Sequence, residues 1–467
     1  MISAPNRRLR LSGSSTVLLS VLMSMLAVAC SGPRQTVKTP PSQDVPPVVK
    51  HDEPVVPDVT HPDILEPRDA GKVDTVQWTE DNKPPLVTDK NEAPSNPPKK
   101  SHFNIALFMP FSAATAPLFS ESQDPKLNRF VQYYAGVELA MREMDSLHLP
   151  VTIRSYDAES ESDAIARLTA LPEVKSADVI VGPYDKKDVE SVAAFGLSHD
   201  IMVVSPWVPA FTTETANPNL IQLSPTLGSH AAAIAQYIRD EMPGKKIYIV
   251  SRDIPAERNR MQFFTKDQII QAEELLIKDA SPDLSNTDLH SKLSDDAGTI
   301  FILPYFAKTD ETFINAFMRK LHADKDTREA IVFGMPQWIG FTNLTSNYME
   351  SLSLHLSISA FTDISQPAYQ AFRNRFFQTF HMVPDLNAFL GYDLMKWLAP
   401  ALAREGHEGL VSHPDPNSFG LASGFDIRPV YKPTSNDNAG HPATPLYYEN
   451  KRIRILKYEG QDFILVR

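Results

Sequence analysis

Residues 103–109 read FNIALFM, an almost unbroken apolar run, and an amphipathic stretch follows them at residues 129–146. The apolar run is too short for a typical helix and carries no polar alternation, which is the pattern of a strand covered on both faces. In the longer stretch, apolar side chains recur at the three- and four-residue spacing of a helix. A buried strand followed by such a helix is typical of a parallel α/β sheet.

The same alternation continues through the chain and predicts two consecutive sheets. The expected strands are 103–109, 151–156, 178–181, 201–204, 246–250, 299–303 and 330–333. The expected helices are 129–146, 163–171, 187–198, 231–241, 261–274 and 312–321. From His102 onward there are about 365 residues, too many for one hydrophobic core. We therefore expect an α/β protein with two doubly wound parallel-sheet lobes joined by a hinge.

The first 29 residues have the order of a secretory signal peptide. Three arginines precede an uncharged apolar run at residues 15–29, and small residues lead into Cys30. The run is about fifteen residues long, whereas a membrane-spanning helix needs about twenty. The end of the run resembles the lipobox of bacterial lipoproteins, although Ala27 stands where that motif prefers leucine. It implies that Cys30 is lipidated, with palmitate among its acyl chains, and anchors the protein to a membrane.

Cysteine usage and the next segment agree with export. Cys30 is the only cysteine of the 467 residues, so no disulfide can form within the chain, and acylation would remove a free thiol from an oxidising compartment. From residue 30 to about 101, roughly one residue in five is proline and large apolar side chains are scarce, which predicts a disordered tether. Such a tether spans about 45–50 Å as a coil and about 200 Å when extended. Ser31, where retention at the inner membrane typically uses Asp, favours the outer membrane, facing the periplasm.

The sequence offers little support for catalysis, cofactors, metals or nucleic acid. It contains no His-Glu-x-x-His, phosphate-binding glycine loop or Gly-x-Ser-x-Gly motif, and its histidines are scattered. Asp157 and Glu159 follow an expected strand and could serve as an acid–base pair, but helix capping explains them better. The net charge of −12 argues against nucleic acid. We expect a protein that is not an enzyme and has no cofactor or metal.

Several short marks, taken in order, resemble type I periplasmic binding proteins of the branched-chain amino-acid-binding kind. They are residues 104–111 (NIALFMPF), 133–137 (YYAGV), 179–183 (VIVGP), 202–206 (MVVSP), 246–250 (KIYIV), 301–305 (FILPY) and 390–393 (LGYD). Each mark alone is weak, but their order and spacing together are moderately specific. The resemblance extends over residues 102–404, and the last sixty residues match poorly.

The resemblance implies two lobes that close on a small ligand at the carboxyl ends of both sheets, where open parallel sheets bind ligands. It places hinge strands near Ser224-Pro225, Ala360-Phe361 and Gly424. The first lobe is expected at residues 102–224 and 361–405, and the second at residues 225–360 and 406–467. Within the family, closure is a shift between two states that the ligand drives by its differential affinity.

The family's amino-acid contacts are mostly missing. The serine that binds the ligand carboxylate falls on or beside Lys186, and the threonine after the Ser-Pro falls on Pro209. The acidic residue that pairs with the ligand ammonium falls on Gln337, and only the aromatic position is kept, as Tyr305. Lys186 could meet an anionic ligand, although a solvated lysine on a first helical turn is the simpler interpretation.

Other candidates follow expected strand ends. Trp207 and Trp338 could sandwich a ring or line a partner groove, but either could equally belong to a core. Ser112 could offer a hydroxyl and an amide, or could form an ordinary turn, and Arg252 could bind a carboxylate or pair with Asp253 or Glu257. The complete set of candidate ligand contacts is Ser112, Lys186, Ser205, Trp207, Arg252, Tyr305, Gln337 and Trp338.

Two classes of function share this fold. The first is a lipid-anchored protein that captures a small solute in an interlobe cleft, for transport or sensing, in the manner of the substrate-binding proteins of ABC transporters. The second is a protein-binding lipoprotein that resembles the activators of penicillin-binding proteins and acts on cell-wall synthesis, although the helical repeat domain of those activators is absent. The partners are therefore a membrane, reached through the anchor, and a small molecule or a cell-wall or transport protein.

Overall fold

The computed structural model describes residues 100–112, 125–158, 163–208, 215–265, 270–279, 281, 283–415, 418, 420–432 and 444–467. The expected signal peptide, Cys30 and almost all of the tether lie outside these ranges, as do Pro209 and Glu159. Within them, no helix is long and apolar enough to cross a membrane.

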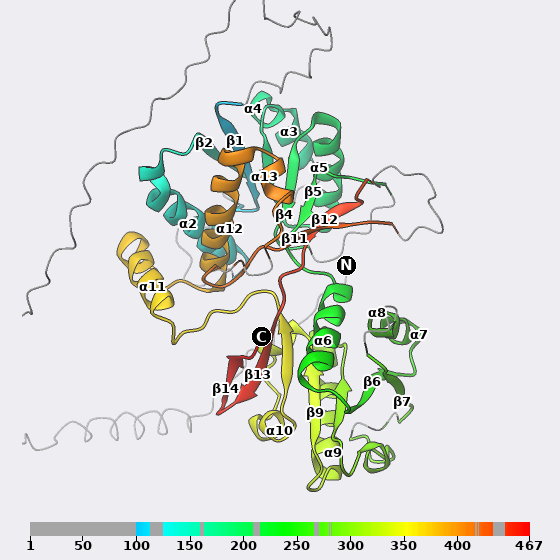
Figure 1. Ribbon diagram of the computed structural model, residues 1–467. Helices are drawn as coiled ribbons and strands as arrows, with labels where there is room; N and C mark the ends of the chain where they lie inside the picture. Colours follow the sequence, from blue (N-terminus) through cyan, green and yellow to red (C-terminus); the bar gives the residue numbers. More distant parts are fainter. Residues whose placement is uncertain are drawn as a thin grey trace, which may run out of the picture. The chain divides into compact units, whose positions relative to one another are not determined.

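The first lobe is built on a seven-stranded sheet in the order β11-β12-β5-β4-β3-β1-β2, in which β11 alone is antiparallel to its neighbour (Figure 1). Its strands are β1 (Phe103–Met109), β2 (Val151–Asp157), β3 (Val179–Val181), β4 (Met202–Ser205), β5 (Leu220–Gln222), β11 (Ile427–Val430) and β12 (Tyr447–Asn450). Its helices are α2 (Pro125–Met144), η2 (Asp145–Leu147), α3 (Ala164–Ala170), α4 (Pro172–Lys175), α5 (Lys186–His199), α11 (Pro367–Phe380), α12 (Leu386–Glu405) and α13 (Glu408–Val411).

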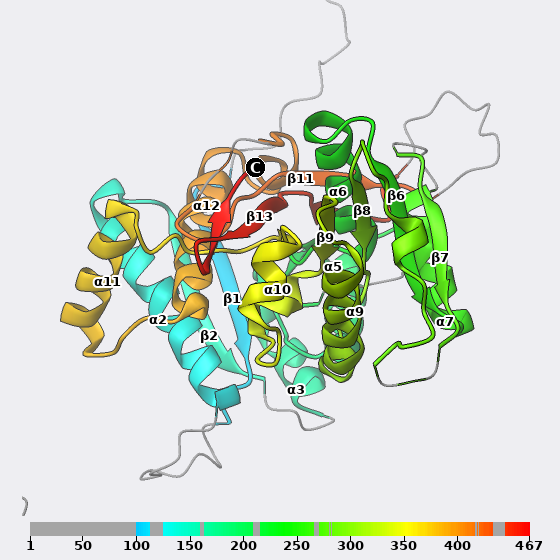
Figure 2. The same ribbon diagram turned by 90° about the horizontal axis from the view of Figure 1, so that it is seen from below.

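The second lobe is built on another seven-stranded sheet, in the order β14-β13-β10-β9-β8-β6-β7, with β13 antiparallel to both neighbours (Figure 2). Its strands are β6 (Lys246–Arg252), β7 (Glu273–Ile277), β8 (Thr299–Ile302), β9 (Ala330–Gly334), β10 (His355–Ile358), β13 (Arg454–Glu459) and β14 (Asp462–Leu465). Its helices are α6 (Leu227–Glu241), α7 (Pro255–Arg258), η3 (Asn259–Met261), α8 (Gln262–Thr265), η4 (His290–Lys292), η5 (Lys308–Asp310), α9 (Glu311–Asp324), η6 (Pro336–Gly340) and α10 (Ser346–Ser351).

Apolar runs form the strands because both faces of each sheet are covered. In β3, Val179 and Val181 join the core under α2 and α12, while Ile180 between them joins the core under α3, α4 and α5. In the second lobe, Tyr237 of α6 and Phe317 of α9 pack on Phe333 and Phe301 of the sheet, respectively. The alternating direction of successive side chains thus gives each central strand two buried faces.

One expected element is wrong. Residues 261–274 were expected to form one helix, but α8 ends at Thr265 and β7 begins at Glu273. β7 pairs in parallel with β6, so this segment supplies the edge strand of the second sheet. A strand-pairing partner overrode the local helical spacing.

The chain passes between the lobes three times, at residues 223–226, 359–366 and 451–453. The first two crossings lie where we expected hinge strands, but the expected third, near Gly424, is wrong. Gly424 precedes β11 within the first lobe, beside the second crossing, where Ala360 forms an antiparallel bridge with Ser423. Residues 406–450 were therefore misassigned to the second lobe: β11 and β12 extend the first sheet, and only β13 and β14 return to the second.

Buried polar side chains connect the first crossing with the third. Glu449, at the end of β12, accepts hydrogen bonds from the Thr226 backbone N–H (2.8 Å) and hydroxyl (3.0 Å), from the Ser229 hydroxyl (2.6 Å) and from Lys451 Nζ (2.7 Å). Thr226 is also the N-cap of α6 and bonds the Ser229 N–H. One carboxylate from the first lobe thereby binds the first turn of the helix that opens the second.

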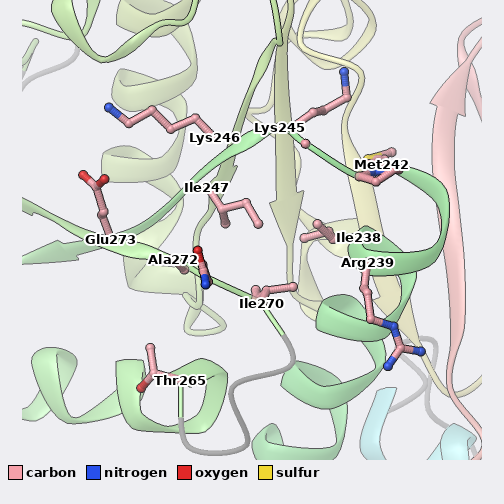
Figure 3. Close-up of a pocket in the computed structure, with 13 residues that line it drawn as sticks. Ile238, Arg239, Met242, Lys245, Lys246, Ile247, Thr265, Ile270, Ala272 and Glu273 are labelled. Carbon is pink, nitrogen blue, oxygen red and sulfur yellow. The ribbon is translucent and has the colours of Figure 1, made fainter.

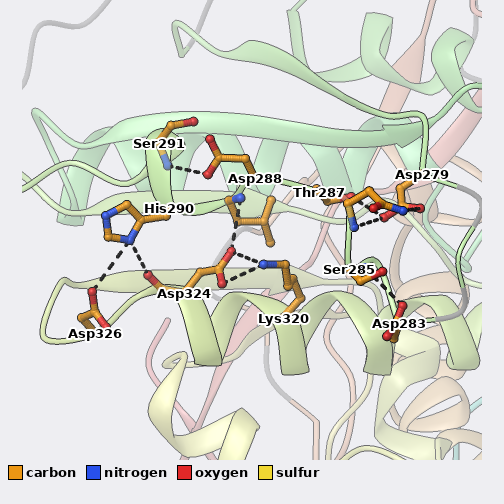
Figure 4. A network of polar contacts seen from close by, with 12 residues as sticks. Asp279, Asp283, Ser285, Thr287, Asp288, His290, Ser291, Lys320, Asp324 and Asp326 are labelled. Atoms are coloured by element: carbon orange, nitrogen blue, oxygen red, sulfur yellow. Dashed lines mark hydrogen bonds and ion pairs between the residues drawn. The ribbon is translucent and has the colours of Figure 1, made fainter.

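The segment after β7 has little regular structure and is held by carboxylates that accept backbone hydrogen bonds (Figure 4). Asp279 accepts from the Ser281 N–H and hydroxyl and from the Asn286 N–H, which lower its pKa to about 2. Asp324 of α9 pairs with Lys320 at 2.7 Å and accepts the Leu289 N–H. These acids are capping groups, and among the described residues no group of three His, Cys, Asp or Glu could hold a metal ion.

The helices α2 and α12 approach so closely that their backbones touch. A β-carbon on Gly136 would lie 1.9 Å from the Ala388 carbonyl oxygen, and one on Gly391 would lie 2.0 Å from the Tyr133 oxygen. Both glycines belong to the sequence marks at residues 133–137 and 390–393. Those two marks therefore reflect helix packing in the first lobe.

We predict that Gly136→Ala lowers the free energy of unfolding by about 1–3 kcal/mol, because the added methyl group forces the two helices apart. Gly340→Ala is the matched control, since a β-carbon there meets no atom within 4 Å. Urea unfolding followed by circular dichroism measures both. A Gly136→Ala protein as stable as the control would contradict the close backbone contact.

Candidate functional site

A pocket of about 220 Å³ lies beside the crossings, on the first lobe. The segments after β4 and β5 contribute Trp207 and Ser224, and α12 contributes Leu390 and Leu394. The complete lining is Tyr133, Pro206, Trp207, Leu223, Ser224, Ser359, Ala360, Leu390, Leu394, Ser423, Phe425 and Asn450. The pocket thus lies at the carboxyl ends of parallel strands, where this class of sheet binds ligands.

None of the described residues that line this pocket is charged. Its polar groups are serine hydroxyls, one tyrosine, one indole and one amide, and Asn450 already donates to the Gly424 carbonyl at 2.9 Å. An ion entering such a site would lose its hydration without gaining a charge partner, which is strongly unfavourable. The lining therefore suits an uncharged, largely apolar ligand.

Trp207 belongs to an aromatic group at this edge of the first sheet. Its ring lies 5.6 Å from that of Phe130, 5.0 Å from that of Tyr133 and 5.9 Å from that of Tyr184, measured between ring centroids. Arg129 donates to the Tyr184 hydroxyl at 3.0 Å. Trp207 itself is half-buried, so this packing holds its ring while leaving part of it at the pocket.

Behind the pocket, Asp393 of α12 holds the wall formed by Ser423. Its carboxylate accepts the backbone N–H groups of Leu421 (2.8 Å), Ala422 (2.8 Å) and Ser423 (2.9 Å). Burial raises the pKa of Asp393, although these hydrogen bonds act in the opposite direction. The aspartate of the mark at 390–393 therefore positions the pocket wall from behind.

Ser205 lies at the end of β4, paired in register with Gln222 of β5. Both side chains are buried, and the Ser205 hydroxyl and both ends of the Gln222 amide have no hydrogen-bond partner in the described part of the chain. Leaving a buried polar group unpaired costs about 1–3 kcal/mol. Such groups at strand ends beside a pocket are more typical of a functional region than of a scaffold.

In the second lobe, the expected ligand contact Arg252 is instead paired with carboxylates of the protein itself. Arg252, at the end of β6, donates to Glu257 at 2.9 Å and to Asp310 at 2.6 Å, and its N–H donates to the Tyr305 hydroxyl at 3.0 Å. Burial opposes ionisation of Glu257, but hydrogen bonds from Arg252 prevail and lower its pKa. Of the two interpretations of Arg252, pairing with Glu257 is therefore correct, and no pair with Asp253 forms.

Tyr305 and Trp338 belong to the core of the second lobe, being 0% and 2% exposed. Trp338 Nε1 donates to the Tyr305 carbonyl at 2.6 Å, and the Tyr305 ring contacts Phe313. Of the two interpretations of Trp338, membership of a core is the correct one, and Tyr305, expected as a ligand contact, is buried in the same core. Large aromatic rings that follow apolar strands are buried in the core because their burial stabilises the fold strongly.

The remaining candidates lie on the surface or in a turn. Lys186 is exposed on the first turn of α5, and Gln337 is exposed in η6. Ser112 is half-buried in a turn with φ of 50°, and its backbone N–H donates to Asp157 at 3.1 Å. Asp157 also accepts the Phe111 N–H at 2.8 Å, so it stabilises the turn after β1.

A larger hollow of about 870 Å³ lies on the second lobe, at the amino ends of its strands, beside the start of β6 (Figure 3). Lys245 and Arg239 line it, but Lys245 pairs with Glu329 and Arg239 with Asp240. Lys246 lies with Nζ 4.9 Å from the Tyr248 ring centroid. Because the hollow borders the amino end of the strands and its cations already have partners, we favour the smaller pocket as the ligand site.

Sequence reasoning missed most of the pocket. Tyr133 and Leu390 were read only as family marks, and Phe425 and Asn450 fall in the last sixty residues, where the resemblance was poor. The sequence feature that could have identified Tyr133 is its position near Gly136, in a helix that was expected to pack on the sheet. Nothing local marks Asn450, because only the long-range pairing of β12 with β5 brings it there.

These two doubly wound lobes, joined by three crossings and carrying a pocket beside them, define a two-lobed solute-binding fold. Structures with this fold include an ABC transporter substrate-binding protein from Desulfitobacterium hafniense (15% identity, 78% of this chain and 100% of that one, TM-score 0.51). A putative branched-chain amino acid ABC transporter protein from Rhodospirillum rubrum is also similar (14%, 78% and 100%, TM-score 0.54). LpoA from Haemophilus influenzae matches as well (12%, 79% and 60%, TM-score 0.51).

The family model for periplasmic binding proteins matches residues 130–419, more than half of the chain. The protein therefore belongs to the periplasmic binding protein family, with the type I fold. No curated protein matches the sequence at a significant level. These three structures are 12–15% identical to the chain, so the likeness to them establishes the fold alone.

We predict that Tyr305→Ala lowers the free energy of unfolding by about 3–5 kcal/mol, because it opens a cavity in the second-lobe core. Lys186→Ala, at an exposed position, should change it by less than about 0.5 kcal/mol. Thermal melts followed by circular dichroism compare the two. A small effect of Tyr305→Ala would contradict the burial of this residue in the core and would make it a candidate cleft contact again.

Proposed function

We propose that the protein is a non-catalytic, lipid-anchored binding protein of the cell envelope that captures a small uncharged solute for transport or sensing. The observation that carries this proposal is the 220 Å³ pocket beside the crossings, whose lining combines aromatic and aliphatic walls with neutral polar groups. Family membership supports ligand binding as the general activity. The pocket's position next to all three crossings would couple occupancy to the relative motion of the lobes.

The ligand class follows from the lining. An amino acid is a zwitterion and needs a partner for each charge, but the described residues of the lining offer no charged side chain, and Gln337 stands where the family places its acid. A compact neutral molecule with an apolar face and one or two hydroxyl or carbonyl groups fits better. The exposed part of Trp207 would contact that apolar face.

We predict that a calorimetric panel of neutral and zwitterionic solutes yields binding only from the neutral group, and that Trp207→Ala weakens it at least tenfold. Phe377→Ala is the control, because Phe377 of α11 is a large aromatic residue that is 51% exposed and does not line the pocket. The same ligand should change the tryptophan fluorescence of the wild type, and this change should be absent from Trp207→Phe, which keeps the other three of the four tryptophans. Tight binding of an amino acid, or equal affinity in the Trp207→Ala protein, would overturn the proposal.

The proposal of a lipid anchor is based on the sequence of residues 1–30 alone. Acyl chains on Cys30 would hold the protein at the outer membrane, facing the periplasm, and the proline-rich tether would let the folded lobes work away from that surface. Family membership supports a location in the cell envelope. No membrane-spanning helix is present among the described residues, so nothing in that part competes with a lipid anchor.

We predict that Cys30→Ala releases the protein from membranes, because the acyl chains supply the anchoring energy. Fractionation with a salt wash, followed by immunoblotting, measures the shift. Cys30→Ser tests whether the acylated thiol itself is required. If either variant still sediments with membranes after the wash, another element anchors the chain.

A second candidate function is a protein-binding lipoprotein that acts on cell-wall synthesis. The fold likeness to LpoA from Haemophilus influenzae is compatible with it, although this chain spans only 60% of that protein. The loss of the family's amino-acid contacts also favours it over amino-acid transport. If no solute in the panel stabilises the protein, this second function becomes the better explanation.

A further inference from the structure

The carboxyl edge of the second sheet presents large apolar side chains to solvent. Ile254 follows β6, Phe306 follows β8 and Ile339 follows β9, and they are 45%, 41% and 46% exposed. Because β9, β8 and β6 are neighbours in that order, these residues follow three consecutive strands. Single exposed apolar residues are ordinary on protein surfaces, but three that follow adjacent strand ends gather at one edge of the sheet.

The arrangement at each strand end is the same. The residue that sequence reasoning selected points inward: Arg252 pairs with Glu257, and Trp338 donates to the Tyr305 carbonyl. The residue one or two places later is the exposed apolar one. The groups that could orient a small polar solute are therefore already satisfied, and what remains at the edge is apolar area.

One cation accompanies this row. The Arg260 guanidinium lies over the Phe306 ring, 4.8 Å from its centroid, and donates to the Pro304 carbonyl at 3.2 Å. It forms no ion pair with any carboxylate in the described part of the chain. Phe306 lies in the middle of the row, and at the β6 end, beside Ile254, the exposed acidic residue is Asp253. The edge is thus positive near Phe306 and negative near Ile254.

We propose that this second-lobe edge, defined by Ile254, Phe306, Ile339 and Arg260, docks a segment of a partner protein. The segment carries a large apolar side chain with a carboxylate beside it, and the carboxylate faces Arg260. Aromatic residues and arginine are enriched at protein interfaces, and arginine on an aromatic ring is a common anchor. A small solute is a poorer occupant, because its site needs convergent polar groups.

The experiment is a selection of random twelve-residue peptides, displayed on phage, for binding to the full-length protein. We expect the enriched peptides to combine large apolar residues with Asp or Glu, and to lose at least tenfold in affinity for Phe306→Ser. Arg260→Glu should reverse the preference, so that peptides with Lys in place of the acid bind better. Ile339→Ser provides a second test if Phe306→Ser unfolds, as judged by its melting curve.

Phe377→Ser is the matched control, since Phe377 of α11 is 51% exposed on the first lobe. Enriched peptides that bind Phe306→Ser and Ile339→Ser as tightly as the wild type would overturn the proposal. So would peptides without acidic residues, or peptides whose binding depends on Phe377. Sedimentation of the wild type decides between occupants: self-association that Phe306→Ser abolishes would make a second copy the occupant and would also overturn it.

Discussion

The buried carboxylate of Glu449 is the interaction on which the two-lobed structure depends. The side chain is 1% exposed, and its hydrogen bonds to Thr226 and Ser229 join the last strand of the first lobe to the first helix of the second. Lys451 supplies the compensating charge at 2.7 Å. A buried charge is tolerated only when it is paired and hydrogen-bonded. Sliding or rotation of one crossing against another would break that set of contacts, so Glu449 restricts the hinge to motions that keep it satisfied.

The second crossing enters the same polar region. His230 of α6 lies beside Ser357 of β10, with 3.0 Å between Nδ1 and the hydroxyl oxygen, and burial lowers the pKa of His230 to about 4 despite the opposing effect of Glu449. The imidazole is therefore neutral at ordinary pH. From β13, Arg454 donates to the Phe361 carbonyl at 3.0 Å. All three crossings are thus held by directed hydrogen bonds, and Ser224, Ala360 and Asn450, at or beside them, line the pocket.

The fold could be predicted from sequence because burial on both faces leaves an apolar signature in each central strand, as in β1 and β3. The expected helix at 261–274 failed where an edge strand is specified by pairing with β6 rather than by its own residues. The return of β11 and β12 to the first sheet was equally invisible, since a partner more than two hundred residues away determines it. For the site, the sequence located the strand ends correctly. Which of two adjacent side chains points outward depends on packing, however, and Tyr305 and Trp338 proved to be the buried ones.

That choice at each strand end also determines which side chains the edge of the sheet presents. When the polar residue faces outward, the edge orients a charged solute; here Arg252 turns inward, and its charge is balanced by Glu257 and Asp310. Balancing it internally keeps the guanidinium out of the pocket region and leaves Ile254 and Phe306 at the surface. In the first lobe, the described residues that line the pocket with Trp207 are likewise uncharged. Among the described residues, both edges thus offer mainly apolar contacts, with Arg260 as a cation beside Phe306, and such edges favour partners recognised by shape and buried area together with a single ionic contact.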